Sequence, residues 1–224
     1  MLPRAGSLTV DIRPALLAAG LMLLATAAAW AGPVRGFRED WTGTSTHGWG
    51  GGAGGGATLS NPGAGGTGGA SDGFLLITQG DPGPYGARST GAEYTGDWMA
   101  AGIERVRVAL NDVGSADTFE IHFCVGNTSN FWQYNPGFVP PNGAWQEFSV
   151  DLTDESQWTR IIGSGTFAEA LQFADRILVR NDSPPFVRVP DLTLGDLGID
   201  GLVLTAGSTA TRATTWGRIK RLYR

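Results

Sequence analysis

A series of short alternating apolar runs, separated by turn signals every 8 to 15 residues, constrains the fold most strongly. Alternation with a period of two is typical of strands that have one buried face. In the clearest run, 118–125, the inward side chains are those of Phe119, Ile121, Phe123 and Val125. Further strands are predicted at 74–78, 103–110, 145–152, 176–180 and 199–205. This spacing of strands and turns predicts an all-β sandwich.

One segment has the pattern of a helix. Thr166 followed three residues later by Glu169 forms a capping box, in which each side chain caps the other's backbone. A short helix is therefore predicted over 167–174, lying across one end of the sandwich, with a single apolar face made by Phe167, Ala170, Leu171 and Ala174.

Glycine is concentrated in the stretch 48–73, where it supplies 13 of 26 residues. So little side-chain material predicts either a long mobile loop or a set of glycine-rich turns. The stretch has no G-x-x-x-x-G-K-[ST] pattern, which excludes a phosphate-binding loop of that kind.

The N-terminal segment has the pattern of an export signal. Arg4 and Arg13 precede the apolar run 15–29, and Ala29-Trp30-Ala31 provides small residues at the cleavage positions. A membrane anchor is the alternative, but about 20 apolar residues are needed to span a bilayer. We therefore predict a signal peptide over 1–31, a secreted or cell-surface location, and no transmembrane segment in the mature chain.

Charge divides the rest of the chain into two parts. Residues 32–211 carry nine arginines against 20 acidic residues, a net charge of −11, whereas five bases crowd the last 13 residues. The acidic part should repel nucleic acid and favour cations or neutral ligands. We predict a domain over 32–208 and a polar linker with a cationic tail over 209–224. The tail is either an attachment or targeting segment or a frayed terminus.

Several landmarks occur in the order found in one family. They include Gly36-Phe-Arg-Glu-Asp40, Tyr94-Thr-Gly-Asp-Trp98, the Trp145-led strand, the 165–171 helix segment, and Gly198-Ile-Asp-Gly-Leu-Val-Leu204. The chain resembles laminin B domains (domain IV type) and their bacterial exported relatives over about residues 36–206. The sequence departs from that pattern in its glycine-rich insertion and in Gly201, where Asn is usual. The resemblance implies a galactose-binding-like jelly-roll β-sandwich of two antiparallel sheets and a non-enzymatic binding or adhesion role.

In jelly rolls of the kind that the resemblance implies, the first and last strands pair, and related carbohydrate-binding modules place a structural Ca²⁺ there. Calcium prefers carboxylate and carbonyl oxygens. Glu39, Asp40 and Asp200 are the candidate ligands. The alternative is that these carboxylates are solvated or hydrogen-bonded to turns.

The segment 130–135 combines aromatic rings with amides, a pattern that suits sugars because their C–H faces stack on rings. If the segment is extended, Trp132 and Tyr134 share one face. The predicted ligand-binding set is Trp132, Tyr134, Gln133, Asn130 and Asn135. The alternative is that the rings belong to the core.

Catalytic patterns are weak. A glycosidase needs two carboxylates flanking the scissile bond, and no such closely spaced pair stands on one strand. A polysaccharide lyase would have to use His122, Tyr134 and Arg88, and no other feature of the sequence supports a lyase site made of these three residues. Cys124 is the single cysteine, so it is a buried thiol or an intermolecular bridge.

Taken together, the sequence predicts an exported, non-catalytic binding or adhesion module, for which a glycan or matrix component is the candidate ligand and a structural calcium the candidate cofactor. A structural cell-envelope component held by its tail, and a polysaccharide lyase or glycoside hydrolase, are the alternative functions.

Overall fold

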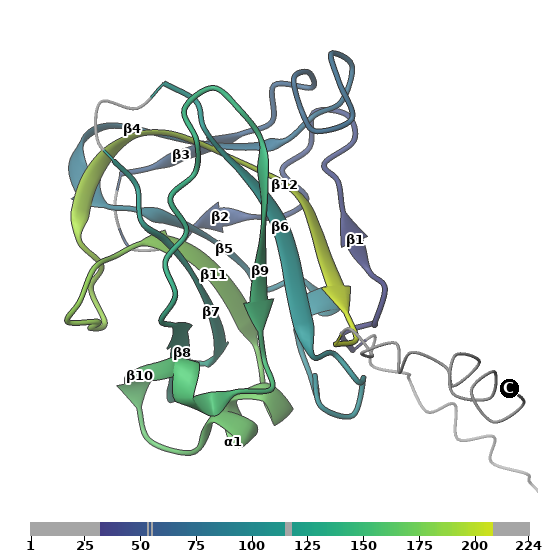
Figure 1. Ribbon diagram of the computed structural model, residues 1–224, viewed down its shortest axis with the longest axis vertical. Coiled ribbons are helices and arrows are strands. Elements are labelled where there is room, and N and C mark those ends of the chain that lie inside the picture. The colour runs from purple at the N-terminus through teal and green to yellow at the C-terminus, as the bar shows by residue number, and fades with distance from the viewer. Residues whose placement is uncertain (1–31, 53, 55, 115–117, 208–224) are drawn as a thin grey trace, which may run out of the picture.

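Two antiparallel β-sheets stack face to face in the computed structural model, which describes residues 32–52, 54, 56–114 and 118–207 (Figure 1). Sheet A has the strand order β3 (Thr58–Ser60), β4 (Leu75–Pro84), β12 (Leu192–Thr205), β6 (Arg105–Asp112) and β9 (Gln146–Asp151), with β1 (Arg38–Glu39) also paired to β12. Sheet B has the order β10 (Trp158–Gly163), β8 (Asn130–Tyr134), β7 (Ile121–Asn127), β11 (Arg176–Asn181), β5 (Gly86–Ser89) and β2 (Gly50–Gly51). The predicted all-β sandwich with two antiparallel sheets and one short helix is confirmed.

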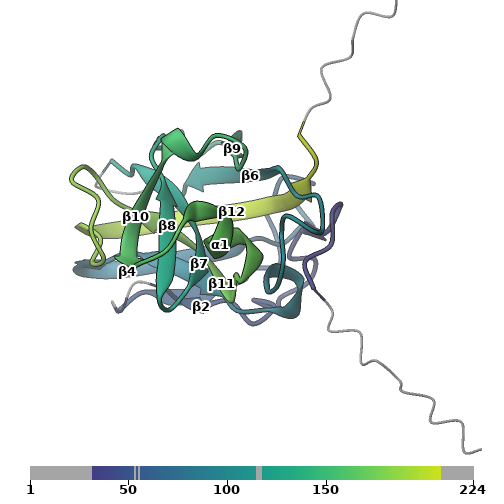
Figure 2. The same cartoon turned by 90° about the horizontal axis from the view of Figure 1, so that it is seen from below.

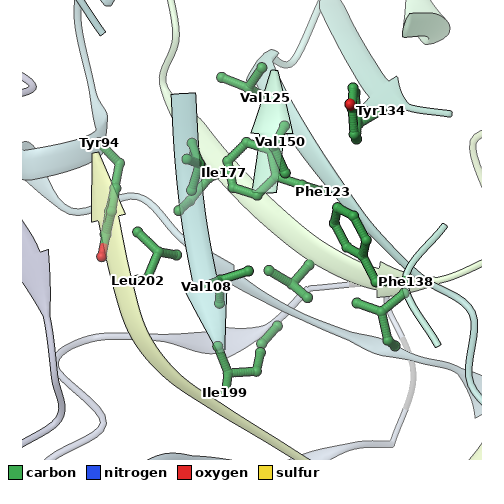
Figure 3. Close-up of a cluster of buried hydrophobic side chains, with 14 of the residues drawn as sticks. Tyr94, Val108, Phe123, Val125, Tyr134, Phe138, Val150, Ile177, Ile199 and Leu202 are labelled. Carbon is green, nitrogen blue, oxygen red and sulfur yellow. The ribbon is translucent and has the colours of Figure 1, made fainter. Parts of the chain in front are cut away.

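The core lies between the two sheets. Figure 3 shows Val108, Ile199 and Leu202 of sheet A facing side chains of sheet B such as Phe123 and Ile177. All five are at most 2% exposed. Burial of each such side chain contributes roughly 1.5–3 kcal/mol to stability.

A β-bulge in β12 changes which residues face this core. Leu197 and Ile199 point inward, yet the next inward residues are Leu202 and Leu204, because the register shifts between Asp200 and Val203. Gly201 has a φ of +56°, a conformation that costs glycine little, so the extra residue fits at this position. β1 pairs with β12 just beyond the bulge, with Glu39 opposite Leu202, as the laminin B resemblance implied for the first and last strands.

The helix α1 (Phe167–Gln172) lies across one end of the sandwich, as Figures 1 and 2 show. Its capping box is formed: Oγ1 of Thr166 accepts from the amide of Glu169 at 3.2 Å, and the Glu169 carboxylate accepts from the amide of Thr166 at 2.8 Å. Phe167 packs on Trp158 with the ring centres 4.5 Å apart. The helix ends two residues before the predicted Ala174. The short 3₁₀ helices η1 (Ala92–Tyr94) and η2 (Glu155–Gln157) complete the helical elements of the described residues.

The strand β4 is longer than the predicted 74–78, because it runs on through Asp81-Pro-Gly-Pro84, a sequence typical of turns. Pro82 and Pro84 cannot donate backbone hydrogen bonds and are tolerated only where a strand has a free edge. β3 pairs with β4 only as far as Thr78, so the later part of β4 has such an edge. The strands β5, β8 and β10 were not predicted either.

The glycine-rich stretch 48–73 is tied to the sandwich in its described part, where it contains β2 and β3. The amide group of the buried Asn61 donates to the carbonyls of Trp41 and Ser45 at 2.8 and 2.9 Å, and its oxygen accepts from the amides of Gly63 and Phe74. This stretch is therefore a set of anchored turns and short strands, the second of the two predicted forms.

The predicted signal peptide 1–31 and the tail 209–224 lie outside the described residues. Within the part of the chain that is described, no helix combines the length and hydropathy that a membrane span requires.

Candidate functional site

The outer face of sheet B carries a cleft of about 340 Å³. β8, β10 and β11 form its apolar part together with the end of the loop 183–191, through Phe131, Ile161, Ile162, Leu178, Val189 and Pro190. The remaining lining is small, polar or basic: Gly52, Gly54, Asn127, Thr128, Arg88, Arg176, Arg180 and Arg188.

β11 places a row of side chains along this cleft. Ile177 and Val179 point into the core, so the alternation of the strand sends Arg176, Leu178 and Arg180 to the outer face. Leu178 pairs across the sheet with Cys124 on one side and Arg88 on the other. The sheet register therefore brings Arg88 beside the central apolar residue of the row.

A small apolar cluster, separate from the main core, forms the floor of the cleft. It consists of Cys124, Phe131, Ile161 and Leu178, each at most 9% exposed, with Ile162 and Phe186 packed against it. Burial raises the pKa of the Cys124 thiol to about 12, so the thiol stays neutral and behaves as an apolar group.

The buried guanidinium of Arg180 ties the loop 183–191 to one end of this floor. Its Nε donates to Oε1 of Gln133 at 2.6 Å, and its NH2 group donates to the carboxylate of Asp182. Two further donations go to the backbone carbonyls of Val187 at 2.6 Å and Arg188 at 3.1 Å. The guanidinium thus makes four hydrogen bonds, two of them to the loop backbone, so the part of the loop that lines the cleft is preorganised.

The other three arginines of the lining differ in their partners. Arg176 bonds to Asp175 at 2.6 Å, whereas the guanidinium groups of Arg88 and Arg188 have no hydrogen bond or ion pair with any residue of the described chain. Both side chains are exposed. They are thus available to a ligand.

The predicted aromatic platform is wrong in its position. Trp132 and Tyr134 do share one face of β8, but that face points into the core, and the rings are 9% and 5% exposed (Figure 3 shows Tyr134 there). The indole of Trp132 donates to Oδ1 of Asn130 at 2.8 Å, and the Tyr134 hydroxyl bonds to Gln157 at 2.6 Å. Side chains alternate along β8, so the rings of Trp132 and Tyr134 fill the core while Phe131 faces the cleft. Phe131 was not among the predicted residues.

The predicted amides have structural partners. Asn130 donates to the carbonyl of Thr166 at 2.8 Å, which fixes the start of α1. Gln133 faces the outer side of sheet B but is fully buried beneath the loop, where it holds Arg180. Asn135 is the exception: its side-chain oxygen is buried without a partner among the described residues, and only its backbone N–H donates, to the carbonyl of Gln157. None of these residues lines the cleft.

The predicted calcium ligands do not form a ligand set. The Glu39 carboxylate accepts from Nδ1 of His47 at 2.6 Å, while Asp40 accepts from the Thr42 hydroxyl at 2.9 Å. Asp200 accepts from both the amide and the hydroxyl of Thr67 at 2.7 Å. Each carboxylate is thus occupied locally, and among the described residues no three acidic, His or Cys side chains are arranged to hold a metal ion.

The three residues considered for a lyase do not converge either. His122 is fully buried, and its ring nitrogens bond to the carbonyls of Tyr134 and Asp182 at 2.8 and 3.1 Å. The Tyr134 hydroxyl points away into the core, and Arg88 lies two strands from His122. A buried imidazole held by two carbonyls cannot reach a substrate proton.

Arg176, Arg188 and Phe131 were not singled out from the sequence, and Arg88 was considered only for a lyase, not for a binding cleft. The pattern Arg176-Ile-Leu-Val-Arg180 could have placed two arginines and Leu178 on one face, opposite the core. Arg88 and Arg188 join them only through strand pairing and the fold of the loop, for which the sequence has no local signal.

No protein-family model and no curated protein matches this chain. Among solved structures, the chain is similar to the family 11 carbohydrate-binding module from Clostridium thermocellum. The match to that module in complex with a β-1,3-1,4-mixed-linked tetrasaccharide has 15% identity and a TM-score of 0.50, covering 75% of this chain and 94% of the module. The match to its solution structure has 17% identity and a TM-score of 0.52, covering 81% and 98%.

An exo-β-agarase matches with 14% identity and a TM-score of 0.51, over 79% of this chain and 25% of the enzyme. These comparisons do not show the laminin B family, which stays a prediction, although the galactose-binding-like fold that it implied fits them. At these identities the likeness concerns the fold, and the chain has the jelly-roll sandwich fold of carbohydrate-binding modules.

Proposed function

We propose that this chain is a non-catalytic carbohydrate-binding module that holds a glycan in the cleft on the outer face of sheet B. The observation that carries the proposal is the composition of that cleft. Its floor of Phe131, Leu178 and Ile161 offers apolar contact to the C–H face of a sugar ring. Guanidinium donors at the rim, from Arg88 and Arg188, are placed for hydroxyl or carboxylate oxygens.

The fold supports the same function. The family 11 module that this chain resembles is described in complex with a tetrasaccharide, and the similarity covers 75% of this chain. The predicted export signal agrees with a module that meets polysaccharides outside the cell. The failure of His122, Tyr134 and Arg88 to converge supports binding rather than polysaccharide cleavage.

A glycan array followed by titration calorimetry tests the function. Thr128 is exposed and lines the cleft, so Thr128→Trp should obstruct it without changing a buried side chain. We expect binding to a glycan by the native chain and its loss in this variant. Val34→Trp adds the same ring at a position that is 60% exposed and does not line the cleft, and it should bind normally.

Two results would count against this function. Glycan binding that survives Thr128→Trp would move the site elsewhere on the molecule. Absence of binding to every glycan of the array would favour the alternative of a structural envelope component.

A further inference from the structure

Charge is distributed very unevenly around the cleft. Residues 32–211 contain nine arginines and 20 acidic residues, and four of those arginines line this one cleft. No acidic residue is among the lining side chains of the described chain. The cleft is therefore basic in an otherwise acidic domain, opposite to the ligand preference that the net charge of −11 predicts.

We propose that the glycan held in this cleft is anionic and carries carboxylate or sulfate groups. This inference rests on the proposed function and specifies its ligand class. Two of the four arginines are already neutralised, since Arg180 is paired with Asp182 and Arg176 with Asp175. Arg88 and Arg188 supply the uncompensated charge.

The position of Arg88 suits a charged sugar. Arg88 is the cross-strand partner of Leu178, and side chains in such pairs lie about 5 Å apart at their Cβ atoms. A sugar ring resting on Leu178 would place a ring substituent within reach of this guanidinium. The planar guanidinium offers two parallel donors that match a carboxylate or sulfate group better than a single hydroxyl.

Arg188 approaches the cleft from a different element. Its backbone carbonyl is held by Arg180 at 3.1 Å, so the base of this exposed side chain is fixed although its guanidinium has no partner in the described chain. A loop fixed in this way loses less conformational entropy when a ligand binds. Two like charges converge on one cleft without a counter-charge in its lining, an arrangement that favours a negatively charged ligand.

The rest of the surface favours a glycan over a nucleic acid as that ligand. A nucleic acid would extend its phosphates far beyond the cleft, over a domain whose net charge is −11, and would be repelled there. A glycan chain has a lower charge density and an apolar ring face, which the floor of Phe131 and Leu178 can accept. The cleft therefore fits a uronate-containing or sulfated polysaccharide.

Matched polymers test the inference. We would titrate the full chain with polygalacturonate and its fully methyl-esterified form, and with carrageenan and its desulfated form, alongside an array of acidic and neutral glycans. We expect at least one acidic glycan to bind about tenfold or more tightly than its neutral counterpart, with affinity falling as salt rises. The pair that responds distinguishes carboxylate from sulfate.

Two substitutions locate the effect. Arg88→Gln and Arg188→Gln should each weaken binding of the acidic glycan about fivefold to tenfold and reduce its salt dependence. Arg107→Gln is the matched control, because Arg107 is an exposed arginine of sheet A that pairs with Glu147 outside the cleft. It should leave the affinity unchanged.

The inference and the proposed function fail in different ways. The anionic ligand is wrong if charged and neutral counterparts bind equally, or if only neutral glycans bind, and if Arg88→Gln and Arg188→Gln bind as the native chain does. In that case the proposed function, a glycan-binding module, still stands. Absence of binding to any glycan overturns both.

Discussion

Nε of Arg180 lies 2.6 Å from Oε1 of Gln133, and both side chains are almost fully buried on the outer side of sheet B. The same guanidinium pairs with Asp182, whose side chain is 1% exposed. Breaking a buried ion pair leaves one charge without a partner, which typically costs about 3–5 kcal/mol. Arg180→Met should therefore lower the free energy of unfolding by about that amount, measured by urea denaturation, and loosen the loop 183–191 toward proteases.

Two further variants sharpen this prediction. Arg107→Met removes an exposed ion pair, with Glu147, and should cost less than about 1 kcal/mol. The double variant Arg180→Met/Asp182→Leu removes both buried charges and should recover part of the loss. A loss for Arg180→Met no larger than that of Arg107→Met would contradict the anchoring role.

Gly52 is packed against the floor of the cleft. A Cβ atom at this position would lie 2.2 Å from Cδ1 of Leu178 and 3.0 Å from the backbone nitrogen of Arg88. Gly52→Ala should therefore displace β5 or Leu178, destabilise the chain by about 1–3 kcal/mol and weaken glycan binding. Thermal unfolding and calorimetry check both effects.

Gly50→Ala is the matched control for this prediction. Gly50 lies two residues before Gly52, on the short strand β2, and a Cβ there meets nothing within 4 Å. Its stability should stay within about 0.5 kcal/mol of the native chain. If Gly52→Ala and Gly50→Ala had the same stability and the same glycan affinity, the close packing of Gly52 on the cleft floor would not matter for either property.

Some of this structure can be predicted from local sequence, and some cannot. The strand β7 was predictable because the large apolar residues Ile121, Phe123 and Val125 recur at every second position, and α1 because its capping box lies within four residues. β8 has no such alternation. Both of its faces are buried, one by the core and one by the cleft floor and the loop, so the pattern cannot say that Trp132 rather than Phe131 faces inward.

The positive charge of the cleft could not be predicted from the sequence, for a related reason. Net charge averages over the whole surface, whereas Arg88, Arg176 and Arg188 come together only through the pairing of β5 with β11 and the return of the loop. These are contacts between segments distant in sequence. The net charge correctly described the domain as a whole as acidic, but it gave the wrong sign for the charge of the cleft.

Asp200 should make stability depend on pH in a defined direction. Burial raises the pKa of Asp200 above its usual value, and hydrogen bonds from Thr67 and Gly201 oppose this rise without cancelling it. The folded chain therefore binds this proton more tightly than the unfolded chain does. Stability from Asp200 is then greatest at acidic pH and is lost as pH rises from the unfolded pKa through the raised folded pKa.

The variant Asp200→Asn isolates this dependence. The asparagine does not titrate, so the free energy of unfolding of the native chain should fall relative to that of the variant as pH rises from 3.5 to 7. Chemical denaturation at each pH gives this difference. A difference that is constant would show that the hydrogen bonds cancel the effect of burial, and a change in the opposite direction would show that they outweigh it.

Cys124 provides a reporter of the opening of sheet B. Its side chain is fully buried within the cleft floor, and burial raises the pKa of the thiol to about 12, so almost no thiolate is present at pH 8. We expect a disulfide reagent to modify it only as fast as the sheet opens, with the rate rising in urea and in Arg180→Met. Thr90→Cys, at an exposed position, should react within the mixing time in the same chain. Rapid modification of Cys124 in the native chain without denaturant would mean that the floor of the cleft opens readily to solvent, and a preorganised binding surface would then be wrong.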